Sequence, residues 1–198
     1  MKTLKKIASL LIITLFLSSC NTNDDGFYNS EFVTIPGLVS IDTPVAPYVV
    51  NDFIYLNSFI DRLQPQANQT TLLDLRKSTG NAPAFGFTFL LEKKVGTEWQ
   101  LITPSNSNDV HIQSGQLVYG GFFSANSVFN LNNDEYEFRA GIKLTSAGQY
   151  RLSFGYNSTS VSDVELRSQS TENNIFLNII SSTTNTLDSD GFYNFTVN

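Results

Sequence analysis

Residues 135–144 read EYEFRAGIKL, a stretch in which polar and apolar side chains alternate. One face collects Tyr136, Phe138, Ala140, Ile142 and Leu144, and the other collects Glu135, Glu137, Arg139, Gly141 and Lys143. Because successive side chains of a strand point to opposite faces, the alternation predicts a β-strand with one buried face. A strand with one buried and one solvated face is typical of an antiparallel sheet.

Two further stretches alternate in the same way, and weaker strand patterns surround them. The apolar positions of the two stretches are Tyr150, Leu152, Phe154 and Tyr156, and Phe85, Phe87, Phe89 and Leu91. The weaker patterns occupy residues 31–35, 48–57, 72–75, 98–103, 110–112, 116–123, 128–131, 161–166, 175–181 and 192–197. Glycine, proline and asparagine turns separate them, and residues 58–64 could form one short turn of helix. Many short strands at this spacing predict an all-β protein, a single antiparallel β-sandwich or barrel rather than a parallel sheet.

The segment between two of these strands has the form of a corner. It runs Leu144-Thr145-Ser146-Ala147-Gly148-Gln149-Tyr150, so a strand ends, a glycine turns the chain, and a tyrosine begins the next strand. This resembles the tyrosine corner of immunoglobulin-like sandwiches, in which the hydroxyl bonds to upstream backbone. The resemblance implies that Tyr150 is a structural clamp. Since the chain after Tyr156 is too long for one final strand, we expect an elaborated immunoglobulin-like sandwich, with a jelly roll as the alternative.

The N-terminus carries the features of a secretion signal. Three lysines precede an apolar run from Ile7 to Leu17, which is 11 residues long. A membrane-spanning helix needs about 20 residues, so we expect this segment to be cleaved. Leu17-Ser18-Ser19-Cys20 holds the only cysteine and resembles the lipobox of bacterial lipoproteins. The resemblance implies acylation of Cys20; an ordinary secretion signal with an incidental cysteine is the alternative.

The same resemblance divides the chain into three parts. They are a signal peptide (residues 1–19), a lipidated cysteine with a flexible tether (20–30), and a β-sandwich domain (31–198). Asp24-Asp25 resembles the acidic sorting motif of surface-exposed lipoproteins in some Gram-negative groups, although a linker can also be acidic by chance. The expected location is therefore the outer membrane, lipid-anchored and exposed on the cell surface. A periplasm-facing anchor is the alternative.

Composition argues against several functions. All 18 acidic residues but only nine of the 12 basic residues follow Cys20, so the mature chain has a net charge of −9. A surface this acidic repels phosphate backbones, which disfavours nucleic acid as a partner. If Cys20 is acylated, no thiol remains for a disulfide, a nucleophile or a zinc ligand. The sequence indicates no cofactor.

Candidate catalytic residues are few. His111 is the only histidine, and the chain lacks the Gly-x-Ser-x-Gly elbow, so we expect His111 to have a surface or hydrogen-bonded role. Glu135 and Glu137 would lie about 7 Å apart on one strand face, a spacing that a glycosidase could use. Arg139 and Lys143 continue that face, so a solvated charged face is the simpler interpretation. We therefore expect that the protein is not an enzyme.

Candidate binding residues lie near turns. Asp188 and Asp190 weakly resemble a calcium loop, but the EF-hand spacing fails, which leaves an irregular calcium site or a plain turn. Residues 190–194 repeat residues 25–29, without wider similarity around the copies. Trp99 follows the Gly96 turn and would form a binding platform if exposed. Tyr119 precedes two glycines that predict a bulge and could present its ring to a sugar or peptide, while Phe122 or Phe123 packs in the core.

Together these observations favour a noncatalytic binding or adhesion module that uses a glycan or a protein as its ligand. A structural or assembly partner of an outer-membrane protein is the first alternative, and it would need a large apolar patch. A small carboxylate-dependent hydrolase is the second, and it would need a cleft with convergent acids. Sandwich folds host all three functions, so the fold alone does not choose among them.

Overall fold

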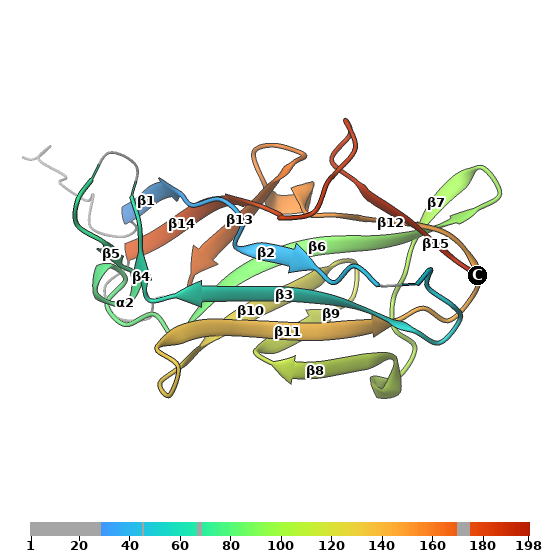
Figure 1. Cartoon of the computed structure of the whole chain (residues 1–198), viewed down its shortest axis with the longest axis horizontal. Helices are drawn as coiled ribbons and strands as arrows, with labels where there is room; N and C mark the ends of the chain where they lie inside the picture. The colour runs from blue at the N-terminus through green and yellow to red at the C-terminus, as the bar shows by residue number, and fades with distance from the viewer. Residues whose placement is uncertain (1–28, 45, 67–68, 170–174) are drawn as a thin grey trace, which may run out of the picture.

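The computed structural model describes residues 29–44, 46–66, 69–169 and 175–198 (Figure 1). The predicted signal peptide, Cys20 and Asp24-Asp25 lie outside these residues, as does most of the first copy of the five-residue repeat. Strands dominate the described chain, so the predicted all-β, sandwich-like fold is confirmed. The first strand begins at Asn29, so the last two residues of the predicted tether already belong to the sheet.

The elements follow one another along the chain with short connections. The strands are β1 (Asn29–Thr34), β2 (Val39–Ile41), β3 (Phe53–Asp61), β4 (Leu63–Gln64), β5 (Leu73–Asp74), β6 (Ala84–Val95), β7 (Glu98–Leu101), β8 (Val110–Ser114), β9 (Gln116–Tyr119), β10 (Phe123–Asn130), β11 (Glu135–Lys143), β12 (Gly148–Ser153), β13 (Asp163–Ser168), β14 (Ile175–Ser182) and β15 (Tyr193–Val197). The helical segments are α2 (Leu75–Ser78), η1 (Ser107–Asp109) and η2 (Gly155–Asn157).

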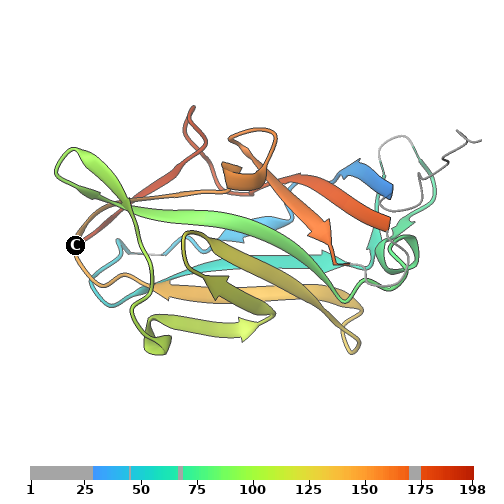
Figure 2. The ribbon, with the colours of Figure 1, turned by 180° about the vertical axis from the view of Figure 1, so that it is seen from behind.

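One large sheet curls over on itself to make the two layers. Its strand order is β1-β14-β13-β6-β10-β11-β3-β2. The two ends of this order meet, because Val39 of β2 forms a parallel bridge to Thr183, just after β14. Figures 1 and 2 show the resulting flattened, elongated body from its two sides. The predicted sandwich is thus built from a continuous sheet.

The long strand β6 is the spine of one layer. Its first half pairs with β13 on one edge and β10 on the other, and its second half pairs with β12 and β7. A further strand, β15, extends this region by pairing with β12. Neighbours along both edges leave β6 few unpaired backbone groups, and its outer positions from Gly86 to Glu92 are partly exposed.

Aromatic side chains fill the space between the layers. Phe89 of β6 stacks on Phe123 of β10 with ring centres 4.8 Å apart, and Phe87 meets Phe138 of β11 edge to face. Each of these rings is buried. The alternating apolar positions that the sequence singled out in these strands therefore point inward, as predicted. Burying such rings removes a large apolar area from water, which is the main stabilising contribution to the fold.

The tyrosine corner is confirmed in its geometry. Tyr150 is 1% exposed, and its hydroxyl donates to the carbonyl oxygen of Ser146 at 2.7 Å. The ring stacks on Phe195 of β15, with centres 5.4 Å apart. Tyr150 therefore closes the turn between β11 and β12 and joins two strands of one layer.

We expect Tyr150→Phe to lower the free energy of unfolding by about 1 kcal/mol, because the half-buried Ser146 carbonyl loses its donor while the ring stays in place. Urea unfolding followed by circular dichroism measures the change. Tyr156→Phe is the matched control, since Tyr156 is 53% exposed, and its effect should stay within about 0.5 kcal/mol. Equal stabilities for both variants would contradict the clamp.

Three local predictions are wrong. Tyr156, predicted on the inward face of a strand, is 53% exposed and lies in η2, because β12 ends at Ser153. Residues 58–64 form the end of β3 and all of β4, not a turn of helix, because β11 pairs with β3 as far as Asp61. The glycines at 120 and 121 do not form a bulge within one strand: they lie in the turn between β9 and β10, which pair antiparallel. The predicted strand over residues 116–123 is therefore a hairpin, in which Phe123 is the buried phenylalanine.

The sequence also missed the single turn of α-helix at α2. Asp74 accepts a hydrogen bond from the backbone N–H of Lys77, so it caps the start of this turn. The guanidinium of Arg62 donates two hydrogen bonds to the same carboxylate, at 2.9 and 2.6 Å. These bonds lower the pKa of Asp74 to about 2, so the carboxylate stays charged and the cap stays intact well below neutral pH.

Candidate functional site

The outer face of the β6–β12 pair carries a stack of two aromatic rings around one guanidinium. The guanidinium carbon of Arg151 lies 4.4 Å from the ring centre of Trp99 and 3.9 Å from that of Phe192. Its Nε donates to Glu92 Oε2 at 2.7 Å. We call these four residues (Glu92, Trp99, Arg151 and Phe192) the Trp99 cluster. Cation–π contacts on both sides and a charge-assisted hydrogen bond hold the guanidinium in one position.

Strand register explains how the cluster forms. Arg151 of β12 pairs with Glu92 of β6, and Trp99 of β7 pairs with Lys94, two positions further along β6. Residues two apart on a strand share a face, so Glu92, Lys94 and their partners all point away from the core. Phe192 completes the cluster from the loop that leads into β15.

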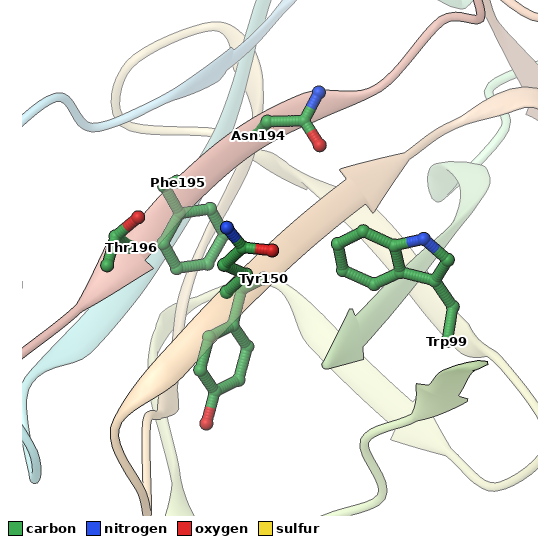
Figure 3. Close-up of a pocket in the computed structure, with 6 residues that line it drawn as sticks. Trp99, Tyr150, Asn194, Phe195 and Thr196 are labelled. Atoms are coloured by element: carbon green, nitrogen blue, oxygen red, sulfur yellow. The ribbon is translucent and has the colours of Figure 1, made fainter. Parts of the chain in front are cut away.

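Two hollows flank the cluster on the same face. The first has a volume of about 300 Å³ and is lined by Trp99, Gln149, Tyr150, Asn194, Phe195 and Thr196. Figure 3 shows the indole of Trp99 extending toward the strand that carries Tyr150, with Asn194 and Thr196 on the neighbouring strand. The second hollow, of about 280 Å³, lies on the other side of Arg151, and its wall includes Phe192 and Tyr156. An aromatic wall beside polar groups is the usual lining of a small-molecule or glycan site.

Trp99 is the one predicted site residue that the structure places in this cluster. Its side chain is half-buried because Arg151 covers part of the ring, and the rest lines the first hollow. Sequence reasoning missed Arg151 and Phe192. The alternation around Tyr150 and Leu152 already places Arg151 on the outer face, but nothing local indicates that β7 and β12 pair with the two edges of β6.

Tyr119 does not join the cluster. It lies at the end of β9 and packs against the core, with its ring centre 6.3 Å from that of Phe123. The neighbouring ring of Phe122 instead stacks on Tyr156, with centres 5.0 Å apart. Tyr156 in turn lines the second hollow, so this pair extends the aromatic wall that Phe192 begins.

Asp188 organises the loop that carries Phe192. One oxygen of its carboxylate accepts from the backbone N–H groups of Asp190 and Phe192, and the other accepts from the side-chain amide of Asn194 at 2.6 Å. The N–H of Phe192 is the main cause of a lowered Asp188 pKa. Among the residues that the structure describes, no three potential metal-binding side chains come together. Calcium binding by Asp188 and Asp190 stays a prediction. The role that the structure shows for the Asp188 carboxylate is to position Phe192.

His111 and Arg139 belong to a hydrogen-bonded network on the outer face of β3, β8 and β11. His111 Nδ1 lies 2.7 Å from the Tyr55 hydroxyl, and the Tyr55 ring lies under the guanidinium of Arg139. Arg139 also donates to Asp42 at 2.7 Å and to Asn57, and its hydrogen bond lowers the pKa of Asp42. These bonds join β3, β8 and β11 to Asp42, the residue that follows β2.

Glu135 and Glu137 lie on the same outer face. Burial is the main cause of a raised Glu135 pKa, and the neighbouring Glu137 raises it further. Glu137 accepts from the side-chain amides of Asn130 and Asn133 at 2.8 and 2.5 Å. Asn130 is the last residue of β10 and Asn133 lies in the turn before β11, so the Glu137 carboxylate stabilises this connection.

No protein-family model, curated protein or solved structure matches this chain. In the described part of the chain, no helix has the length and apolar character needed to cross a membrane. The argument for function therefore depends on the chemistry of the Trp99 cluster and of the faces around it.

Proposed function

We propose that the protein is a lipid-anchored, noncatalytic binding module of the bacterial cell envelope. The observation that carries the proposal is the Trp99 cluster with a hollow on each side. Its guanidinium is already paired with Glu92 and covered by two rings, so it is suited to holding a surface rigid rather than to proton transfer. A rigid aromatic surface beside polar side chains is suited to binding.

The position of the Trp99 cluster supports a role in binding a partner that lies away from the membrane. The described chain begins at β1, at one end of the elongated body, whereas the β6–β7 hairpin and the C-terminus lie at the opposite end (Figure 1). The twelve residues of β6 connect these ends, a length of about 40 Å. A chain anchored through Cys20 would therefore hold the membrane-distal end, with Trp99, toward its partner.

Trp99 is the only tryptophan of the chain, so its fluorescence reports on the cluster directly. We expect at least one macromolecule from a panel of neutral polysaccharides, acidic polysaccharides, mucin and gelatin to shield Trp99 from acrylamide quenching by twofold or more. The measurement uses the full lipidated protein in detergent micelles. Phe59→Ala is the matched control, since Phe59 is 47% exposed on β3, outside the cluster, and should leave the shielding unchanged.

Quenching that no member of the panel changes would contradict the binding function. The anchor has its own test, in which labelled fatty acid is fed to cells and followed on the protein. Cys20→Ser should leave a folded domain that no longer sediments with membranes. Label that persists on this variant would place the lipid elsewhere.

A further inference from the structure

A third hollow lies further along the outer face of β6, beyond the Trp99 cluster. The outward side chains of β6 alternate with its buried ones, so Glu92, Leu90, Thr88 and Gly86 follow each other on the outer face. Glu92 and Leu90 line the second hollow, and Thr88 and Gly86 line the third, which has a volume of about 250 Å³. We call the face from Gly86 to Trp99 the β6 groove. From Gly86 to Glu92 it extends about 20 Å, before the indole of Trp99.

The third hollow is lined by planar polar side chains. Asn126, Glu165, Arg167 and Gln169 surround it, and Gln169 Nε2 donates to Asn126 Oδ1 at 2.6 Å. The floor is Gly86, and a Cβ at this position would lie 2.9 Å from Asn126 Oδ1, so it would displace that side chain. Amide, carboxylate and guanidinium groups in fixed positions can donate to and accept from ligand hydroxyl groups.

Charge along the β6 groove is nearly balanced. Its walls carry three acidic side chains, Glu92, Glu165 and Asp190, and two arginines, Arg151 and Arg167. The guanidinium of Arg167 lies 4.4 Å from the ring centre of Phe176. The whole chain carries a net charge of −6, so an anionic ligand would be repelled at long range. These charges disfavour an anionic ligand, and the near-balance within the groove gives no strong local attraction for a cationic one.

The backbone around the β6 groove disfavours a peptide ligand. Extended peptides gain much of their affinity by pairing with a free strand edge. The strand under the groove has no such edge along most of its length, since β13 and β12 pair with one side and β10 and β7 with the other. A ligand here must be recognised through side chains alone.

From these four observations we infer that the β6 groove binds an extended neutral polysaccharide. One sugar ring lies against the indole of Trp99, and hydroxyl groups further along the chain bind the amides of Asn126 and Gln169. The inference rests on the proposed binding function and adds the class of ligand, its direction along β6, and the polar residues that contact it.

The test is native gel electrophoresis of the lipidated protein in detergent, through gels that contain one polysaccharide each. The neutral probes are mixed-linkage β-glucan, xyloglucan, galactomannan and dextran, and the acidic probe is alginate. We expect at least one neutral probe to retard the protein and alginate not to. Trp99→Ala should weaken that retardation at least tenfold and Asn126→Ala at least threefold, whereas Phe59→Ala should not change it.

Circular dichroism shows whether each variant is folded, and Gln169→Ala replaces Asn126→Ala if the latter is not. Retardation that Trp99→Ala and the polar variant leave unchanged would overturn the site. Shielding of Trp99 by gelatin, without retardation by any neutral probe, would overturn the polysaccharide inference and leave the binding function standing. Neither shielding nor retardation by any probe would overturn both.

Discussion

Replacing Gly115 with alanine should destabilise the protein by about 3–5 kcal/mol, or prevent it from folding. Gly115 connects β8 to β9 with a φ of +73°, which costs an L-residue about 1–2 kcal/mol. A Cβ at this position would also lie 2.5 Å from the backbone oxygen of Asn126 and 2.7 Å from that of Glu137. Both neighbours are backbone atoms of paired strands, so they cannot move aside without breaking the sheet.

The position matters because two strands separate there. β10 and β11 pair only over Val128–Asn130 and Glu135–Glu137, next to their turn. Beyond that point β10 pairs with β9 and β11 pairs with β8, so the β8–β9 segment fills the widening gap (Figure 2). Gly115 lies at the apex of this gap, between the two strands.

Urea unfolding of purified Gly115→Ala and Gly121→Ala compares the two glycines. Gly121 is the matched control, because its added Cβ would meet no atom within 4 Å. We expect the Gly121 variant to stay within about 1 kcal/mol of the parent. A Gly115 variant as stable as the parent would show that the sheet does not separate at this point.

Local pattern was enough to predict the strands that form the core. The alternation in residues 135–144 predicts β11, and the tyrosine after Gly148 predicts the corner, because both depend on neighbours within a few positions. Residues 58–64 were predicted wrongly because their secondary structure depends on a strand distant in the sequence: β11 pairs with β3 as far as Asp61. The short strand β2 was missed for the same reason, since it forms on β3 and on the segment after β14.

The candidate site could be predicted only in part. Trp99 could be identified because a tryptophan after a turn is unusual in itself. Its partners Arg151 and Phe192 are 52 and 93 positions away along the chain, and only the pairing of β6 with both β7 and β12 brings them together. The β6 groove has the same origin, since β10 and β13 contribute its polar side chains from opposite edges of β6.

The second large effect on stability is expected from replacing Phe89 in the core. Phe89 is 1% exposed, and its ring stacks on that of Phe123 with an interplanar angle of 3°. Its ring centre is also 6.4 Å from that of Phe154, so it packs against rings from two other segments of the chain. Truncating a buried phenylalanine to alanine leaves a cavity that the surrounding strands of a sheet can close only in part.

Phe89→Ala should therefore lower the free energy of unfolding by about 3–5 kcal/mol, a large share of the 5–15 kcal/mol typical of a domain. Phe89→Leu keeps most of the volume and should cost about half as much, since it leaves a smaller cavity. Phe59→Ala, at a position that is 47% exposed, should change stability by less than about 1 kcal/mol. Urea unfolding of the three variants ranks them, and a Phe89→Ala protein no less stable than Phe59→Ala would mean that the two layers do not pack through this ring.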